Sequence, residues 1–264
     1  MTGKIITLTT DFGLKDPYVA EMKAAIVGIC PDAQIVDITH EVKKFDVRMG
    51  AFMLACSAPY FPKGTIHVAV VDPGVGAQRR PIIIVTSQGI FVGPDNGVLV
   101  LAALKQEIIG AREITNPKLM LPEVSNTFHG RDLFAPAAAK LAEGVPPNSF
   151  GPEIGEAVKP DFAKSTFDNG VAMGEVLYVD GFGNVITNID AKHLSRLHSK
   201  GMINVWLPKS ERKLRLGKAY AEVDLKEAMV LVGSQGYVEI AVNQGSAARK
   251  FKAKPGDKVM LSAI

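Results

Sequence analysis

The sequence has few cysteines, little net charge and no long apolar run. Cys30 and Cys56 are the only two cysteines in 264 residues, and each lies in an apolar stretch, which argues against a disulfide framework and a thiolate zinc cluster. Thirty Lys and Arg residues against 27 Asp and Glu residues leave a charge of +3, too small and too evenly spread to indicate a nucleic acid or a membrane surface as a partner. No apolar run reaches the ~18 residues of a membrane span, and the apolar stretch at the N-terminus is too short for a signal peptide. We therefore expect a cytoplasmic protein that binds neither nucleic acid nor membrane.

The first half of the chain alternates between short β-branched runs and segments of helical periodicity. With 47% hydrophobic residues, the chain can form a real core. The alternation predicts an α/β layer structure with a mostly parallel sheet over residues 1–155. Strands are expected at 5–10, 35–38, 65–71, 82–85 and 90–92, the last two as a hairpin, and helices at 17–29, after Asp46, at 98–104 and from about 131.

The second half shows almost no helical periodicity. A stretch rich in proline and glycine follows Gly144, and we predict a linker at 156–169. Short runs separated by turns then predict a small antiparallel β-barrel domain over residues 170–264. Its strands are expected at 174–179, 185–189, 203–207, 230–232, 237–242 and 258–261.

The segment TTDFG and the following Asp16 come directly after the first predicted strand. In open α/β sheets ligands bind beyond the carboxyl ends of the strands, so Asp11 and Asp16 stand where a carboxylate can bind ribose hydroxyls or an ammonium group. A helix cap with a turn is the alternative interpretation.

The segment VVDPGVGAQRR ends an apolar strand at Asp72 and reaches Arg79 seven residues later. It matches neither the Walker loop nor the G-x-G-x-x-G fingerprint. The spacing lets the loop fold back and place the guanidinium beside the carboxylate, which would keep Asp72 ionised. A structural ion pair that fixes a tight turn explains the same residues.

The segment SNTFHGRD precedes the last predicted helix of the first half. His129 lies in its glycine-containing loop and can act as an acid or a base near neutral pH. A capping role is the alternative. His129 and Asp132 could also ligate a metal, but no second His and no Cys stands near them in sequence, and we expect no metal.

Two loops of the second half combine aromatic and amide side chains. YVDGFGNVITNI contains Asp180, Phe182 and Asn184, and VGSQGYVEIAVNQGSA contains Ser234 and Glu239. Such residues can stack on a purine and bond to its edge. Simple hairpin turns would also place Gly and Asn between strands, and Tyr220 could equally pack the barrel.

Taken in order, TTDFGLKDPY, ITHEVKKFDV, VDPGVGAQRR, GPDNG, TFHGRD, DGFGNVITNI and GSQGYVEIAVNQGSA resemble the S-adenosyl-L-methionine (SAM) hydroxide adenosyltransferases, relatives of the halogenating enzymes that make 5′-fluoro- and 5′-chloro-5′-deoxyadenosine. The resemblance runs from about residue 5 to residue 245. It implies an α/β domain followed by a β-barrel domain, and a homotrimer with active sites at subunit interfaces.

The resemblance also implies roles for individual residues. Asp72, Arg79 and His129 match the trio that handles water in the family. Asp11 looks like the residue that binds the ribose diol, and Phe45 like the one that packs on the sugar. The remaining substrate contacts implied are Asp16, Asp180 and Ser234 near methionine, Phe182, Asn184, Tyr220 and the backbone around Val242 near adenine, and Glu239 elsewhere in the pocket.

The reaction implied is attack of water on ribose C5′ of SAM, giving adenosine and L-methionine without a cofactor. Among the trio, His129 is the acceptor that we expect for the proton, since its ordinary pKa of about 6.5 lies near neutrality. Lowering of the water pKa by Arg79 is the alternative. A halide-dependent adenosyltransferase and a non-catalytic adenosine- or SAM-binding protein are the competing functions. The resemblance implies that the halogenating relatives carry other residue types at the positions of Asp72 and His129, and that the fluorinating ones have a longer insertion in the first domain. The stretch between residues 82 and 97 is short here, and both differences favour water over halide.

Overall fold

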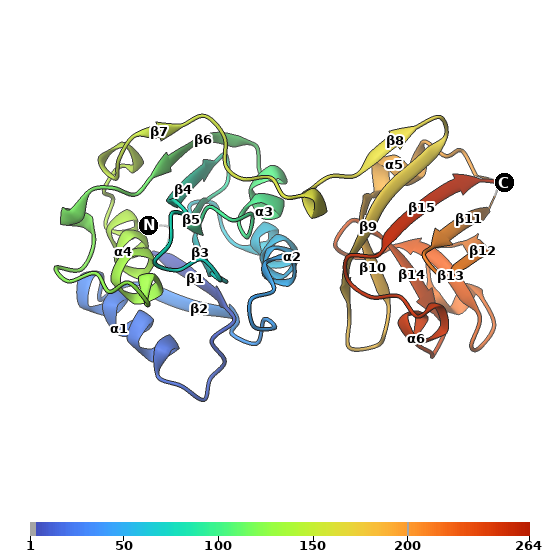
Figure 1. Ribbon diagram of the computed structural model, residues 1–264, viewed down its shortest axis with the longest axis horizontal. Coiled ribbons are helices and arrows are strands. Elements are labelled where there is room, and N and C mark those ends of the chain that lie inside the picture. Colours follow the sequence, from blue (N-terminus) through green and yellow to red (C-terminus); the bar gives the residue numbers. More distant parts are fainter. Residues whose placement is uncertain (1–3, 200) are drawn as a thin grey trace. The chain divides into compact units, whose positions relative to one another are not determined.

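The computed structural model describes residues 4–199 and 201–264, and this part of the chain divides between Lys159 and Pro160 into two compact units (Figure 1). The boundary between the units lies inside the segment predicted as a linker. That segment is not wholly irregular, because it contains the short 3-10 helix η5 (Asp161–Ala163) and the strand β8 (Thr166–Asp168). β8 pairs antiparallel with the next strand across a turn at Gly170, whose φ of 75° suits glycine.

A seven-stranded sheet forms the centre of the first unit, in the order β2-β1-β3-β5-β4-β6-β7. Its four strands β2, β1, β3 and β5 are parallel, and the pairings of β4 with β5 and β6 and of β6 with β7 are antiparallel. This arrangement confirms the predicted mostly parallel α/β fold and the hairpin. The bounds are β1 (Ile5–Thr10), β2 (Gln34–Thr39), β3 (Ile66–Val70), β4 (Pro81–Thr86), β5 (Ile90–Pro94), β6 (Ile108–Glu113) and β7 (Glu153–Ile154).

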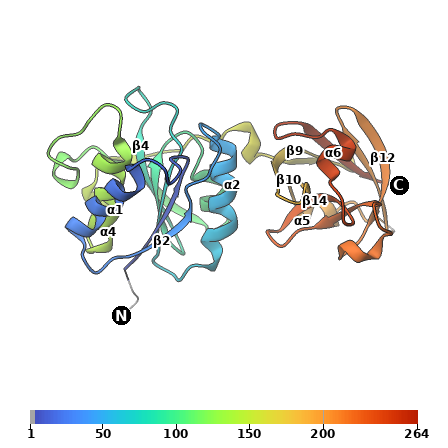
Figure 2. The ribbon, with the colours of Figure 1, turned by 90° about the horizontal axis from the view of Figure 1, so that it is seen from below.

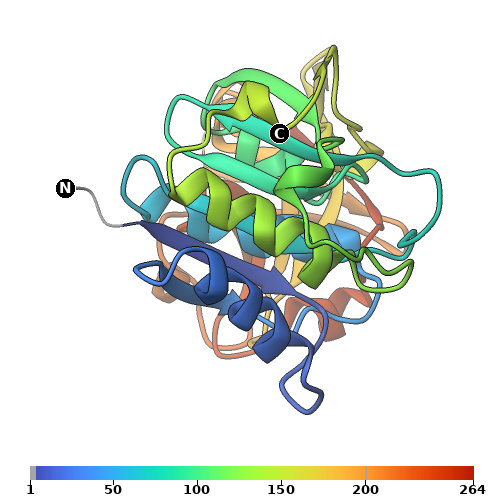
Figure 3. The same cartoon turned by 90° about the vertical axis from the view of Figure 1, so that its left-hand side faces the viewer.

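Helices cover both faces of this sheet. α1 (Tyr18–Ile29) and α4 (Ala135–Ala142) lie side by side on one face, and α2 (Val47–Ser57) and α3 (Val100–Leu104) cover the other (Figures 2 and 3). The Asp46 side chain caps α2 by accepting from the Met49 N–H, as the sequence predicts. A π-helical turn, η3 (Gly130–Phe134), precedes α4, and the remaining short helices are η1 (Ala58–Tyr60), η2 (Pro117–Leu119) and η4 (Pro147–Ser149).

The buried faces of α1, α4 and the central strands share one apolar core. Ile6 and Leu8 of β1, Met22 and Ile26 of α1, and Phe134 at the start of α4 are fully buried in it. This packing fixes the strand ends and the first turn of the last helix, from which the candidate site is built.

The second unit is a closed barrel. Seven strands follow one another around it in the order β10-β14-β13-β12-β11-β15-β9, and β9 pairs again with β10. All pairings are antiparallel except that of β12 with β13. The bounds are β9 (Val171–Val179), β10 (Val185–Asp190), β11 (Met202–Leu207), β12 (Ser210–Leu216), β13 (Ala228–Val232), β14 (Tyr237–Val242) and β15 (Lys258–Ala263), with the short helices α5 (Ala191–Ser195), η6 (Tyr220–Glu222) and α6 (Ala247–Phe251) between them. The closed sheet removes most strand edges and confirms the predicted β-barrel.

Candidate active site

The parallel register places two aspartates at one edge of the first sheet. Thr10 of β1 is paired with Val70 of β3, Asp11 follows Thr10, and Asp72 follows the strand β3 at the same end. Carboxyl ends of adjacent parallel strands meet at one edge, where open α/β sheets bind ligands. Asp11 and Asp72 therefore project from neighbouring positions for a reason that lies in the backbone register.

The loop after β3 brings Arg79 back onto Asp72 and His129. Arg79 donates from Nε and Nη2 to Asp72 Oδ2 over 2.8 and 2.6 Å, and its Nη2 lies 2.6 Å from His129 Nδ1. The Asp72 and Arg79 side chains are only 5% and 10% exposed. The guanidinium also lies over the Phe134 ring, 5.4 Å from its centroid. The three residues singled out from the sequence thus form one contiguous, largely desolvated group.

The contact with Arg79 determines the protonation state of His129. An arginine can only donate hydrogen bonds, so His129 Nδ1 accepts and the neutral ring carries its proton on Nε2. Burial of the ring and the positive charge of Arg79 lower the pKa of His129 below its ordinary value, against the opposing charges of Asp72 and Asp132. At neutral pH His129 therefore stands as a neutral imidazole whose free position is an N–H donor.

Among the described residues, only one of the two carboxylate oxygens of Asp72 has hydrogen-bond partners. Both bonds from Arg79 end on Oδ2, whereas the buried Oδ1 has no hydrogen-bond partner among the described residues. A buried carboxylate oxygen without a partner carries a substantial desolvation cost. Oδ1 is therefore the acceptor atom of Asp72 that the described residues leave unused.

The side chain of Asp11 is hydrogen-bonded to the backbone of Phe45. Its Oδ2 accepts from the Phe45 N–H over 2.8 Å, and Phe45 has φ 65°, a left-handed conformation unusual for a residue with a side chain. The Phe45 side chain is 69% exposed, whereas Asp11 is 5% exposed. Asp16, the third residue predicted nearby, is exposed and precedes α1.

In the second unit the loop after β9 is organised by Asp180. Its Oδ1 accepts from the backbone N–H groups of Phe182 and Asn184, and its Oδ2 accepts from Asn184 Nδ2 over 3.0 Å. Phe182 is 83% exposed at the tip, and Asn184 is buried. The loop therefore has the geometry of a tight turn. The Phe182 ring at its tip has little contact with the rest of the second unit.

A second polar group of the barrel pairs Tyr220 with Glu239. The Tyr220 hydroxyl donates to Glu239 Oε1 over 2.8 Å. Burial raises the pKa of Glu239; the hydrogen bond from Tyr220 opposes this rise, and the negative charge of Asp180 adds to it. Burial also raises the pKa of Tyr220 to about 12, so the hydroxyl remains a donor at neutral pH. Ser234 is exposed on the loop before β14, and Val242 is buried at the end of that strand.

Some contacts of the site carry no signal in the sequence. Gly76, with φ 76°, lies where the loop after β3 meets the loop before His129, and a Cβ there would collide with the backbone carbonyl oxygen of Asn126. The ring of Phe134 beneath Arg79 looks like any core residue in the sequence. A glycine within a loop and an aromatic in a helix are too common to have identified either residue.

Two further observations limit what else the chain contains. Within residues 4–199 and 201–264, no group of three or more His, Cys, Asp and Glu side chains is placed to hold a metal ion. In the same part of the chain, no helix combines the length and the apolar character needed to cross a membrane.

Comparison with known proteins places both units in one family. Residues 6–151 match the SAM hydroxide adenosyltransferase N-terminal domain, and residues 174–260 match the C-terminal domain. The chain belongs to the SAM hydroxide adenosyltransferase family. This finding confirms the resemblance seen in the sequence.

Relatives in the family match nearly the whole chain. A protein of Salinispora arenicola named (R)-S-adenosyl-L-methionine hydrolase is 39% identical, with 98% of this chain and 97% of the relative covered, and one of the same name from Thermus thermophilus is 38% identical over 96% and 97%. A solved structure of an uncharacterized conserved protein from Thermotoga maritima superposes with a TM-score of 0.87 at 40% identity, covering 98% of this chain and 99% of that chain.

Fluorinases are more distant relatives. The fluorinase of an Actinoplanes species is 28% identical and covers 96% of this chain and 95% of its own length. The alignment extends over 294 positions, more than the 264 residues of this chain, so the fluorinase contains inserted residues.

Proposed function

We propose that this chain hydrolyses S-adenosyl-L-methionine by attack of water or hydroxide on ribose C5′, giving adenosine and L-methionine. The observation that carries the proposal is the Asp72–Arg79–His129 group, in which Arg79 bridges Asp72 Oδ2 and His129 Nδ1 and the buried Asp72 Oδ1 has no partner among the described residues. The names of relatives at 38–39% identity over nearly full length support it.

The bond changes need little acid catalysis. The water oxygen forms a bond to C5′ while the C5′–S bond breaks. The electron pair of the breaking C5′–S bond goes to the sulfonium sulfur, so methionine leaves as a neutral thioether. Holding water in line for attack can contribute about 7–11 kcal/mol, whereas general-base assistance gives about 10²–10⁴ in rate. Positioning is therefore the main task of the site.

The proton released from water needs an acceptor, and the geometry favours Asp72 over His129. The hypothesis drawn from the sequence was that His129 accepts the proton. With Nδ1 occupied by Arg79, the ring can donate through Nε2 but has no free lone pair. Asp72 Oδ1 accepts the hydrogen bond from water, and Arg79, whose charge favours developing hydroxide, holds Asp72 in place. The proton then leaves for solvent through this carboxylate.

The substrate contacts proposed from the family are Asp11, Asp16 and Phe45 in the first unit and the residues around Asp180 and Glu239 in the second. The carboxylate of Asp11, already turned toward the Phe45 N–H, suits a ribose diol. The exposed Phe182 ring suits stacking on adenine. No cofactor or metal takes part in the proposed chemistry, and a chelator is expected to leave turnover unchanged.

We also propose a homotrimer in the cytoplasm, in which complete active sites form at subunit interfaces. The free thiols of Cys30 and Cys56 are consistent with a reducing compartment. Light scattering after gel filtration measures the mass directly. Mixing inactive Asp72→Asn and Asn184→Ala subunits should restore part of the activity if different subunits supply the two residues to one site; no recovery after subunit exchange would contradict this.

Incubation of the purified protein with SAM in ¹⁸O water tests the reaction. We expect labelled adenosine and an equal amount of methionine by mass spectrometry, and neither from the Asp72→Asn variant. A parallel reaction with chloride or fluoride should give no 5′-halo-5′-deoxyadenosine; its formation would favour a halide adenosyltransferase. Tight adenosine binding without methionine release would indicate a non-catalytic binding protein.

A further inference from the structure

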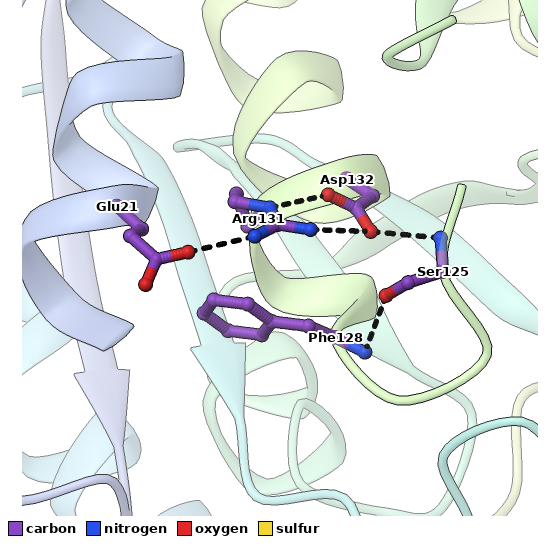
Figure 4. A network of polar contacts seen from close by, with 5 residues as sticks. All are labelled: Glu21, Ser125, Phe128, Arg131 and Asp132. Atoms are coloured by element: carbon purple, nitrogen blue, oxygen red, sulfur yellow. Dashed lines mark hydrogen bonds and ion pairs between the residues drawn. The ribbon is translucent and has the colours of Figure 1, made fainter. Parts of the chain in front are cut away.

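A second polar network involves residues on both sides of His129 in the sequence, namely Ser125, Phe128, Arg131 and Asp132, together with Glu21 (Figure 4). At its centre is Asp132, a carboxylate with no exposed surface. Arg131 donates to it from Nε over 2.6 Å and from Nη2 over 3.2 Å, and the Ser125 N–H donates over 2.8 Å. Arg131 Nη1 donates to Glu21 of α1 over 2.7 Å. The network thus ties both ends of the loop that carries His129 to α1.

Members of this network contact Phe128, which immediately precedes His129 in the chain. Its N–H donates to Ser125 Oγ over 3.0 Å, and its carbonyl accepts from the Asp132 N–H over 3.1 Å. The Arg131 guanidinium lies over its ring, 5.1 Å from the centroid. Both backbone groups and the side chain of Phe128 are therefore held by members of the network.

The same ring connects to the loop that carries Asp11. Phe128 packs edge-on against Phe12, with 5.7 Å between centroids, and against Tyr18 at 5.1 Å. Phe12 directly follows Asp11 in the chain. A shift of Phe128 would consequently move the residues flanking two parts of the candidate site.

We propose that Asp132 is a positioning residue, which acts through Ser125, Arg131 and Phe128 to hold the His129 ring against Arg79. The inference rests on the proposed function, because it assigns the network a part in turnover. The Arg79–His129 contact is 2.6 Å, so a displacement of about 1 Å would leave the hydrogen-bonding range. The π-helical turn that begins at Gly130 agrees with this role, since such turns occur often at functional sites.

Burial acts to raise the pKa of Asp132, but the hydrogen bonds from Arg131 and Ser125 outweigh it, and the pKa lies below its ordinary value. The carboxylate is therefore charged at neutral pH. Asp132→Asn keeps the size of the side chain but replaces one carboxylate oxygen with an NH₂ group. This NH₂ group would face an N–H donor of Arg131 or Ser125 instead of accepting from it.

Kinetics with SAM gives the first test. Asp132→Asn is expected to lower kcat about 10- to 100-fold, with KM changed less than about threefold, because the chemical step depends on geometry within about 1 Å. Glu21→Gln, which removes the negative charge that pairs with Arg131 but leaves Asp132 in place, should lower kcat by less. The matched control is Glu123→Gln, since Glu123 is exposed and lines the same open cavity as Ser125 and Arg131; it should behave as wild type.

The ¹⁵N shifts of the His129 ring give a second readout that needs no turnover. The wild type should show the Nε2–H tautomer, and Asp132→Asn a mixture of tautomers; a purely structural role would lower stability and leave these shifts unchanged. If Asp132→Asn does not fold, Glu21→Gln and Ser125→Ala decide. Unchanged kcat and unchanged His129 shifts in the folded variants would overturn the inference. If the wild type forms no adenosine, the proposed function fails instead, and the shifts still test the positioning.

Discussion

Replacing Arg79 with lysine tests the core of the proposed site. Arg79 makes two hydrogen bonds to Asp72 and one to His129 from a planar fork. A lysine ammonium keeps the positive charge but presents a single nitrogen, which cannot occupy the Nε and Nη2 positions together. The substitution therefore removes the geometry of the contact while retaining its sign of charge.

The expected loss follows from the bonds removed. A hydrogen bond to a charged group contributes about 1.5–3 kcal/mol, so losing two of the three costs about 3–6 kcal/mol. If the whole loss falls on the transition state, kcat drops about 10²- to 10⁴-fold, at about 1.4 kcal/mol per factor of ten. The assay is the initial rate of adenosine formation from SAM over a concentration series, followed by chromatography.

The neighbouring residue provides a matched control. Arg80 donates from Nε and Nη2 to Asp95 Oδ2 over 2.9 and 2.5 Å, the same two-bond arrangement on a buried aspartate, but without a histidine. Arg80→Lys should lower the melting temperature and leave kcat within about threefold of wild type. The reasoning is refuted if Arg79→Lys retains wild-type kcat, or if the two variants lose kcat equally.

Three further predictions concern pH and backbone geometry. Because neutral His129 accepts from Arg79, kcat should be constant above about pH 7 and fall only well below pH 6.5 in a pH profile; a fall centred at or above 6.5 would contradict this. Burial lowers the pKa of His67 to about 4, so the unfolded chain binds a proton between pH 6.5 and 4 that the folded chain does not, and stability present above pH 6.5 is lost as pH falls. In urea unfolding, the free energy of unfolding should fall by about 2 kcal/mol less for His67→Gln than for the wild type between pH 7 and pH 5. An equal fall in both proteins would argue against a lowered pKa of His67. Gly76→Ala, which strains a positive φ and meets Asn126, should lower stability by about 1–3 kcal/mol, whereas Gly110→Ala, with open space around its Cβ position, should have a much smaller effect in the same melts.

The fold followed from the sequence where local pattern decides it. Strand β1 spans the predicted residues 5–10, α1 begins one residue after the predicted start, and Asp46 caps α2. Apolar periodicity and capping chemistry operate within a few residues, so they are visible without coordinates. The β8 strand is not predicted because a three-residue edge strand has too little pattern to detect.

The sequence by itself determined which residue types were available, namely a carboxylate after each of two strands, an arginine seven residues on and a histidine before a helix. Only the tertiary structure decided that both arginine bonds end on Asp72 Oδ2, that Oδ1 is left over, and that the nitrogen of His129 facing Arg79 is Nδ1. It also decided that Asp132 is fully buried, whereas most aspartates in proteins are exposed. The physical reason is that hydrogen-bond partners 50 residues apart are set by strand register and core packing, and a proton's position depends on the partner at a distance of about 3 Å, which no local pattern specifies.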